Sequence, residues 1–309
     1  MVSATALPVD ISMLVDLLLI LVIKVFQQVL RILPENCQRN TGIFLGRLAF
    51  RLLKKRRKVA ISNIQRVFKD YPVKEAHDVA LRCFEKLGIN FVEALLLPYI
   101  PTKEYEKRFA IEHREYVDEA LLLNKGMIAL VFHYANWEIM GIASWFFKNP
   151  VVVLARPLKR HRLIDGFMNR MRASTGLTVI PNVNTSKDVM RFLKENKIIA
   201  ILGDQREKRS KGIYVDFFNE SVPTTRGITT IGMKTGTPVL PVYFIRKGFL
   251  RYVIRCSKPL EMERKGNIEE LIQKNTRKIN AFLETIILEN PDEWFWVHRR
   301  WERARREKR

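Results

Sequence analysis

The segment Met127-Ile-Ala-Leu-Val-Phe132, followed at once by His133-Tyr-Ala-Asn-Trp-Glu138, decides the fold of this chain. Six apolar residues in a row predict a buried strand, which ends where polar residues begin. Further apolar runs occur at residues 151–155, 177–180, 198–202, 239–245 and 252–256, and helical stretches such as 164–173 and 186–195 separate several of them. Strands that alternate with helices predict an α/β fold with a mainly parallel central sheet and flanking helices.

The first apolar segment, Ile11 to Leu33, predicts a membrane-anchoring helix. Its interrupting polar side chains fall within one sector of about 120° on a helix; they are Asp16, Lys24, Gln27, Gln28 and Arg31. A clean spanning helix requires about 20 apolar residues without charges. We therefore favour a helix partly sunk in the cytoplasmic leaflet over one that spans, and a helix of the protein core is the alternative.

The residues between this segment and the first strand have a helical pattern. Apolar residues recur at helical spacing over 43–53, 59–68 and 79–97, and another long amphipathic helix is predicted at 268–288. We therefore divide the chain into an N-terminal membrane anchor (1–33) and one domain (34–309). This domain has a helical part over 34–125 and an α/β catalytic core over 126–309.

The charge of the chain predicts an anionic partner. Its 54 Lys and Arg residues against 32 Asp and Glu residues give a net charge of +22, and seven basic residues fall within 47–58. An apolar anchor beside a basic cluster is typical of binding to an anionic membrane surface. A basic nucleic-acid-binding protein is the alternative from another class, but no helix-turn-helix, zinc-finger or RNP-like pattern supports it, so we expect no nucleic acid. No metal-binding or dinucleotide-binding motif is visible in the sequence, and we expect no metal and no cofactor.

His133 and Glu138 are the strongest candidates for catalysis. In an open α/β sheet, catalytic groups collect at the carboxyl ends of the strands, and His133 directly follows one. We expect the turn into the next helix to bring Glu138 back to one imidazole nitrogen, which leaves the other free to take a proton from an alcohol. A surface histidine and a first-turn glutamate beside a helix dipole are the plain alternative. We interpret His77, His113 and His161 as surface residues.

Five segments, in order, resemble the lipid A biosynthesis (lauroyl and myristoyl) acyltransferase family, within the glycerolipid acyltransferase superfamily. The first is the His-x4-Glu segment after the buried strand. The others are Val153-Leu-Ala-Arg156-Pro157, Gly203-Asp-Gln205 with Val215-Asp-Phe-Phe218 and Pro223-Thr-Thr-Arg-Gly227, Thr235-Gly-Thr-Pro-Val-Leu-Pro241, and Pro291-Asp-Glu-Trp-Phe-Trp-Val-His-Arg-Arg-Trp301. The resemblance covers roughly residues 12–301.

The resemblance implies an O-acyltransferase at the cytoplasmic face of the cell inner membrane. It would move a fatty acyl chain from acyl-acyl carrier protein, or from acyl-CoA, to a hydroxyl of a glycolipid such as a lipid A precursor. The implied catalytic residues are His133 as general base and Glu138 as its orienting partner. The implied substrate-binding residues are Arg156, Asp204, Gln205, Asn136 and Arg226.

The alternatives that remain are an acyltransferase acting on another membrane lipid and a scaffold that kept the fold and lost catalysis. The sequence has no Gly-x-Ser-x-Gly motif, and none of its three cysteines lies in a motif. This pattern favours direct transfer of the acyl chain over a covalent acyl-enzyme. The intact His133 and Glu138 pair argues against a scaffold.

Overall fold

The short apolar runs of the sequence form one seven-stranded sheet in the computed structural model, which describes residues 11–181, 186–208 and 210–301. The strand order is β1-β9-β8-β2-β5-β3-β4. The bounds are β1 Phe109–Glu112, β2 Met127–Val131, β3 Val151–Ala155, β4 Leu177–Pro181, β5 Ile198–Leu202, β8 Val239–Gly248 and β9 Arg251–Cys256. Neighbouring strands are parallel, except that β8 and β9 are antiparallel. The prediction of an α/β fold with a mainly parallel sheet is therefore confirmed.

The two central strands β2 and β5 bring distant parts of the sequence together. All five residues of β2 are buried, as expected for a parallel strand that is covered on both faces. Val131 at its end is in register with Leu202 of β5, and the amide of Gly203 donates to the carbonyl oxygen of Val131 (3.0 Å). His133 and Asp204 therefore leave the sheet side by side, although they are 71 positions apart in the sequence.

Helices connect the strands and pack on the sheet. Their bounds are α5 Tyr105–Arg108, α6 Glu115–Leu122, α7 Gly141–Phe147, α8 Arg162–Ser174, α9 Ser186–Lys194, α10 Gly227–Thr235 and α11 Ile268–Glu289. Short 3₁₀ turns lie at η1 Leu97–Tyr99, η2 Thr102–Glu104, η3 Trp137–Met140 and η4 Pro291–Glu293. Helix α11 buries Leu271, Ile279 and Leu283 in the core, so the long amphipathic helix predicted at 268–288 is confirmed.

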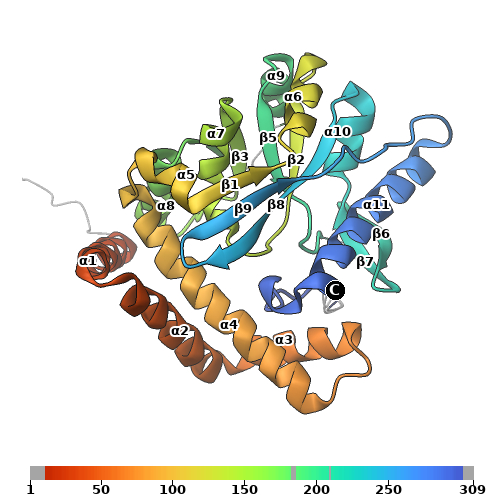
Figure 1. Cartoon of the computed structure of the whole chain (residues 1–309). Helices are drawn as coiled ribbons and strands as arrows, with labels where there is room; N and C mark the ends of the chain where they lie inside the picture. Colours follow the sequence, from red (N-terminus) through yellow and green to blue (C-terminus); the bar gives the residue numbers. More distant parts are fainter. Residues whose placement is uncertain (1–10, 182–185, 209, 302–309) are drawn as a thin grey trace, which may run out of the picture.

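Four helices come first among the described residues: α1 Ile11–Ile32, which is the segment predicted as the anchor, and α2 Glu35–Leu52, α3 Lys54–Val67 and α4 Val73–Leu96 of the helical part. Helix α4 lies between α2 and the sheet (Figure 1). Glycines allow α2 and α4 to approach until their backbones touch. A Cβ atom added at Gly46 would lie 2.2 Å from the carbonyl oxygen of Phe84, and one added at Gly88 would lie 2.1 Å from that of Gly42. Any larger side chain at these positions would push the two helices apart.

Helix α1 has the reverse of the usual amphipathic arrangement. Its polar residues Asp16 and Gln27 are buried against the protein, where the Gln27 side chain donates to the carbonyl oxygen of Leu95 (3.0 Å). Its exposed residues are mostly large and apolar, among them Met13, Leu14, Leu17, Leu18, Leu21, Val22, Val25 and Val29, and they also include Lys24, Gln28 and Arg31. The segment Ser12–Ile32 is long and apolar enough to cross a membrane. This surface is suited to contact with lipid rather than with water.

Two features of the fold were absent from the sequence predictions. Strand β1 lies inside the stretch 34–125 that we interpreted as helical, and it forms the edge of the sheet beside β9. Its four residues are too few to show an alternating pattern. The hairpin of β6 (Gly212–Phe217) and β7 (Glu220–Thr225) was also missed, because its strands expose every second side chain and do not form an apolar run.

Candidate active site

A cleft of about 850 Å³ opens beyond the ends of the parallel strands β2, β3 and β5. The candidate residues that line it are His133, Glu138, Arg156 and Gln205, together with His298 of the closing segment. Apolar side chains form much of the remaining wall, among them Met140, Leu158, Met168, Val189 and Ile231. The cleft thus combines charged and polar groups around His133 with apolar side chains on other parts of its wall.

A hydrogen-bonded pair of His133 and Asp204 lies at the centre of the site. The Nδ1 atom of His133 is 2.7 Å from Oδ1 of Asp204, and the backbone amide of His133 donates to Oδ2 (2.9 Å). The Asp204 side chain is 1% exposed and the His133 side chain is 14% exposed. Two bonds from one residue fix both the position and the rotation of the imidazole ring.

The closing segment supplies a third donor to Asp204. The indole Nε1 of Trp294 donates to Oδ2 of Asp204 (2.9 Å), and the amide of Phe295 donates to the carbonyl oxygen of His133 (3.0 Å). Burial alone would raise the pKa of the Asp204 carboxyl, but the His133 ring and these N–H donors hold that pKa below its usual value. Asp204 is therefore an ionised carboxylate at neutral pH.

Gln205 contacts the other nitrogen of the catalytic candidate. Its amide Nε2 lies 3.1 Å from Nε2 of His133. An ionised Asp204 carboxylate can only accept hydrogen bonds, so Nδ1 of His133 must donate to it. In a neutral ring the single proton is then assigned to Nδ1, and Nε2 is an acceptor. The lone pair of Nε2 thus faces the cleft, where an alcohol could replace the Gln205 amide.

Glu138 does not occupy the position that we expected from the sequence. Its carboxylate binds the Arg172 guanidinium of α8 through two hydrogen bonds, of 2.9 and 3.0 Å, while Asp204 holds Nδ1 of His133. The prediction that Glu138 contacts the His133 imidazole is therefore wrong. The chain continues from His133 into the 3₁₀ turn η3, which directs Glu138 toward α8 on the cleft wall.

Asn136 faces the protein interior rather than the cleft. Its side chain is 0% exposed, and its amide donates to Oε2 of the buried Glu93 (2.9 Å). Asn90 of α4 donates to the carbonyl oxygen of Ala135 (2.6 Å), a residue with a φ of +50°. A non-glycine residue in this conformation is strained, and its surroundings must hold it there. Asn136 therefore shapes the loop after β2, and the predicted contact with substrate does not fit its position.

The two arginines of the prediction lie in different places. Arg156 is exposed and lines the cleft just beyond β3, as we expected. Arg226 forms an ion pair with Glu269 (2.7 Å), and its neighbours Thr225 and Gly227 are the residues that line the cleft. The ion pair holds Arg226 against the start of α11, so its position gives no support to a role in substrate binding.

His298 connects the closing segment to the loop after β5. Its Nε2 accepts a hydrogen bond from the amide of Arg206 (3.0 Å). Burial lowers the pKa of His298 to about 4, so the ring is neutral at pH 7 and can act as this acceptor. The residue lines the cleft but is already bonded to the backbone, which makes it a support for the loop.

Comparison with known proteins decides the family. The family model for bacterial lipid A biosynthesis acyltransferases matches residues 9–303. This chain belongs to that family. It is 25% identical to a lipid A biosynthesis palmitoleoyltransferase of Escherichia coli over 268 residues, which cover 86% of this chain and 85% of the relative. It is 21% identical to the E. coli lipid A biosynthesis lauroyltransferase over 275 residues, covering 87% and 86%. A phosphatidylinositol mannoside acyltransferase of Mycolicibacterium smegmatis is 25% identical over 187 residues, covering 59% and 60%.

Membership of the lipid A biosynthesis acyltransferase family confirms the resemblance carried by the five sequence segments. The chain is an acyltransferase. The fold brings the first, third and last of those segments together at Asp204. Both His133 and Trp294 are hydrogen-bonded to its carboxylate. The hydrogen bond from the Trp294 indole N–H to Asp204 could not have been found without the fold, because these residues are 90 positions apart in the sequence.

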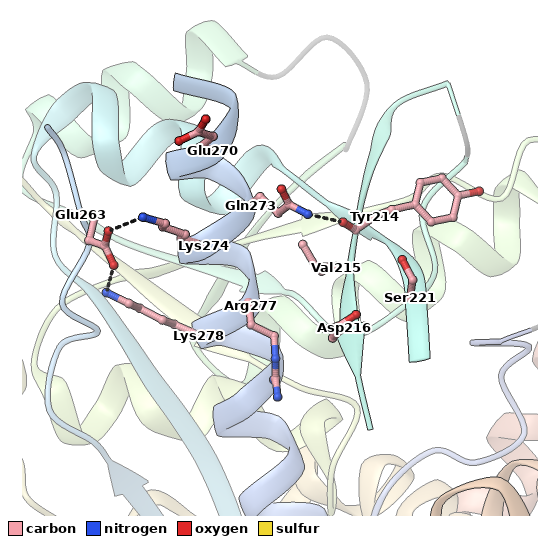
Figure 2. Close-up of a pocket in the computed structure, with 10 residues that line it drawn as sticks. All are labelled: Tyr214, Val215, Asp216, Ser221, Glu263, Glu270, Gln273, Lys274, Arg277 and Lys278. Carbon is pink, nitrogen blue, oxygen red and sulfur yellow. Dashed lines mark hydrogen bonds and ion pairs between the residues drawn. The ribbon is translucent and has the colours of Figure 1, made fainter. Parts of the chain in front are cut away.

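A second groove of this acyltransferase lies between the β6–β7 hairpin and α11 (Figure 2). Its charged side chains bind one another: Lys274 and Lys278 lie 3.8 and 3.1 Å from Glu263, and Gln273 donates to the carbonyl oxygen of Tyr214. The described residues that line this groove include no histidine. The His133 cleft thus contains histidines, and the described lining of this groove does not.

Proposed function

We propose that this acyltransferase moves a fatty acyl chain from a thioester donor to a hydroxyl group of a lipid A precursor, with His133 as the general base. The observation that carries the proposal is the His133–Asp204 pair, which leaves Nε2 of His133 directed into the cleft. Relatives named for lipid A acylation support this acceptor. Acylation of another membrane lipid is the alternative, and relatives named for a phosphatidylinositol mannoside motivate it.

The proposed reaction needs one base and no covalent acyl-enzyme. Nε2 of His133 takes the proton of the acceptor hydroxyl as its oxygen attacks the thioester carbonyl carbon. The tetrahedral intermediate then collapses, the carbon–sulfur bond breaks, and the thiolate leaves with the proton from His133. A new ester and a free thiol result, and the imidazole returns to its neutral form.

Asp204 takes the orienting role in this proposal, because its carboxylate holds Nδ1 and stabilises the imidazolium that forms during transfer. Glu138 acts through Arg172: the pair fixes η3, which follows His133, against α8 on the cleft wall. Gln205 holds Nε2 until the acceptor hydroxyl takes its place. Arg156, exposed at the rim, would bind an anionic group of a substrate or the developing negative charge.

We propose acyl-acyl carrier protein as the donor, and acyl-CoA as the alternative. Carrier proteins are acidic, and this chain has a net charge of +22. The basic residues Arg156, Arg206 and Lys208 line the cleft, and the exposed Lys159 and Arg160 follow Arg156. Arg209, in the same basic run, lies outside the described residues. Positive charge around a cleft steers an acidic partner toward it and weakens as salt screens it.

The enzyme is proposed to work at the cytoplasmic face of the inner membrane. The exposed apolar side of α1 would lie in the lipid, and α8, which packs against α1, carries residues of the cleft wall such as Met168. Such an arrangement would bring the cleft close to the lipid and supports entry of a lipid acceptor directly from the membrane. The basic cluster at 47–58 would meet the anionic headgroups.

The test is transfer by purified His133→Ala and by a matched control, His113→Ala, which removes an exposed histidine beside Glu115. Radiolabelled acyl-carrier protein and acyl-CoA would be supplied separately with a lipid A precursor. Loss of a general base should lower kcat by about 10²- to 10⁴-fold in the first variant and leave the control unchanged. Near wild-type transfer by His133→Ala would refute the mechanism. A KM that rises with salt for the carrier but not for acyl-CoA would support the carrier as donor.

A further inference from the structure

Helix α2 exposes a row of large apolar side chains outside the cleft. Phe44 is 64% exposed, Leu48 is 38% exposed and Leu52 is 68% exposed. Residues four positions apart lie on the same face of a helix, so these three form one ridge. In Figure 1, α2 runs from the end of α1 along the outer side of α4.

The packing of α2 on α4 fixes the direction of this ridge. Gly42 and Gly46 are buried and touch the backbone of α4 around Gly88. Rotation of α2 would bring a side chain into this contact, where an added Cβ atom already has no room. The ridge of Phe44 and Leu48 therefore cannot turn inward, and no described part of this chain covers it.

Basic side chains accompany the ridge. Arg51 lies on the same side of α2 between Leu48 and Leu52, and the exposed Lys54 and Lys55 follow where α2 passes into α3. Arg47 is 59% exposed and also bonds Glu85 of α4 (2.6 Å). Apolar side chains flanked by basic ones are the pattern of a helix that lies in the headgroup region of an anionic bilayer.

The ridge lies next to the exposed apolar side of α1, which we propose to lie in the lipid. The Gln38 side chain of α2 donates to the carbonyl oxygens of Leu30 and Leu33 (both 3.0 Å), so it closes the corner between the two helices. Helix α2 therefore begins directly where the apolar exposed side of α1 ends at Ile32, which is 83% exposed. A bilayer that holds α1 would reach the first turns of α2.

We infer that the α2 face formed by Phe44, Leu48, Arg51 and Leu52, together with Lys54 at the start of α3, docks on the headgroup region of an anionic phospholipid bilayer. This inference rests on the proposed membrane location and adds a second, interfacial contact to α1. With two helices in contact, the molecule has a fixed tilt and rotation on the membrane. That tilt would hold the cleft wall formed by α8 at a constant height above the lipid.

An acidic carrier protein is the rival occupant of this face. The positive charge of this face would suit a carrier protein, since Arg51 and Lys54 could pair with the carboxylates of the carrier. Its acyl chain, however, must reach His133, and the α2 face contributes none of the described residues that line the cleft. The large exposed area of Phe44 and Leu52 also fits lipid better than an acidic surface, so we favour the bilayer.

The experiment measures the surroundings of α2 in the full chain. Cys37 is exposed and the other cysteines are buried, so Cys37→Ser gives a background without accessible thiols. An environment-sensitive nitrobenzoxadiazole dye would be attached to Phe44→Cys, Leu48→Cys or Leu52→Cys. The matched control is Leu122→Cys on α6, which is 78% exposed and lies on the opposite side of the molecule from α2 (Figure 1). Vesicles would contain phosphatidylglycerol and a spin-labelled quencher lipid.

We expect dye at the three α2 positions to shift to shorter wavelength and to be quenched by the spin-labelled lipid, while dye at 122 behaves as in water. Quenching at α2 no greater than at 122, in protein that is bound to the vesicles, would overturn the inference. Protection of the α2 dyes by added carrier protein, without quenching by lipid, would also overturn it in favour of the rival. Protein that does not bind vesicles at all would instead refute the membrane location on which the inference rests. The readout needs no catalysis, and His133→Ala should give the same result.

Discussion

Two histidine–aspartate pairs of the same geometry occur in this acyltransferase, one in the cleft and one where α1 meets α8. His133 and His161 each bring Nδ1 to 2.7 Å from Oδ1 of an aspartate, Asp204 in the first pair and Asp16 in the second. In both pairs the aspartate is 2% exposed and also accepts a bond from a backbone amide. That amide belongs to His133 itself in the first pair (2.9 Å) and to Leu163 in the second (3.1 Å).

The pairs differ in what surrounds the free nitrogen of each ring. The His133 side chain is 14% exposed and its Nε2 faces the cleft beside Gln205. The His161 side chain is 47% exposed and lies just before the first turn of α8. Asp16 thus joins α1 to the start of α8, as a capping residue supplied by another helix. We propose that the His133–Asp204 pair is catalytic because its free nitrogen faces the cleft, and that the His161–Asp16 pair is a structural contact between α1 and α8.

The largest effect is expected from Asp204→Asn. The amide cannot be ionised, so it no longer favours the proton on Nδ1 or stabilises the imidazolium, and kcat should fall by about 10³- to 10⁴-fold. Steady-state transfer kinetics measure this change, and far-ultraviolet circular dichroism checks that the variant is folded. The comparison breaks if Asp204→Asn keeps wild-type kcat, because the cleft pair would then be no more catalytic than the α1–α8 pair.

Glu138 is the carboxylate nearest to His133 in the sequence, but its contact with Arg172 indicates a smaller role in catalysis than that of Asp204. The variant Glu138→Ala tests this. Loss of the two bonds to Arg172 should loosen η3 against α8 and misplace His133, which lowers kcat by about 10- to 100-fold. Arg172→Ala removes the same contact from the other side and should give a similar loss. Additive losses in the double variant would show that Glu138 acts independently of Arg172 and would contradict this account.

A third histidine, His298, is bonded to a backbone amide and not to an aspartate. The variant His298→Gln sharpens the comparison by testing how this residue titrates. The pKa of His298 is about 4 in the folded protein, against about 6.5 for an unfolded chain. Between these values the unfolded chain binds a proton that the folded protein does not, so the free energy of unfolding falls as the pH falls through this window. From pH 7 to pH 5 the loss should be about 2 kcal/mol.

Glutamine can accept from the Arg206 amide without binding a proton, so His298→Gln should lack this part of the pH dependence. Urea unfolding at pH 7 and pH 5, in the same detergent, measures both proteins. An unchanged pH dependence in the variant would show that His298 is not the titrating group.

The smallest effect is expected from Asp16→Asn and from His161→Ala. Each removes a bond between α1 and α8, which should lower the free energy of unfolding by about 1–2 kcal/mol, while kcat changes little. Thermal unfolding and transfer assays on the same preparations separate the two quantities. A loss of kcat comparable to that of Asp204→Asn would show that the α1–α8 contact is part of the catalytic site, and the distinction between the pairs would no longer hold.

The sequence by itself determined the local features of this protein. Runs of apolar residues and their spacing predicted six of the seven strands of the central sheet, the helices of the N-terminal part and the apolar segment of α1, since these depend on neighbouring residues. The position of His133 directly after β2 was visible in the same way, and so was the place of Arg156 after β3. The order of five segments was enough to indicate the family.

Tertiary structure alone decided which side chains meet. The pairing of His133 with Asp204 follows from the parallel register of β2 and β5, which local sequence patterns do not encode. Glu138, five residues from His133, was the nearer carboxylate in the chain, but η3 turns it to Arg172. His161 is exposed, as predicted, but only the fold brings Asp16 to it from 145 positions away. A hydrogen bond depends on distances of a few tenths of an ångström, and for residues far apart in the chain only the packed fold sets such distances.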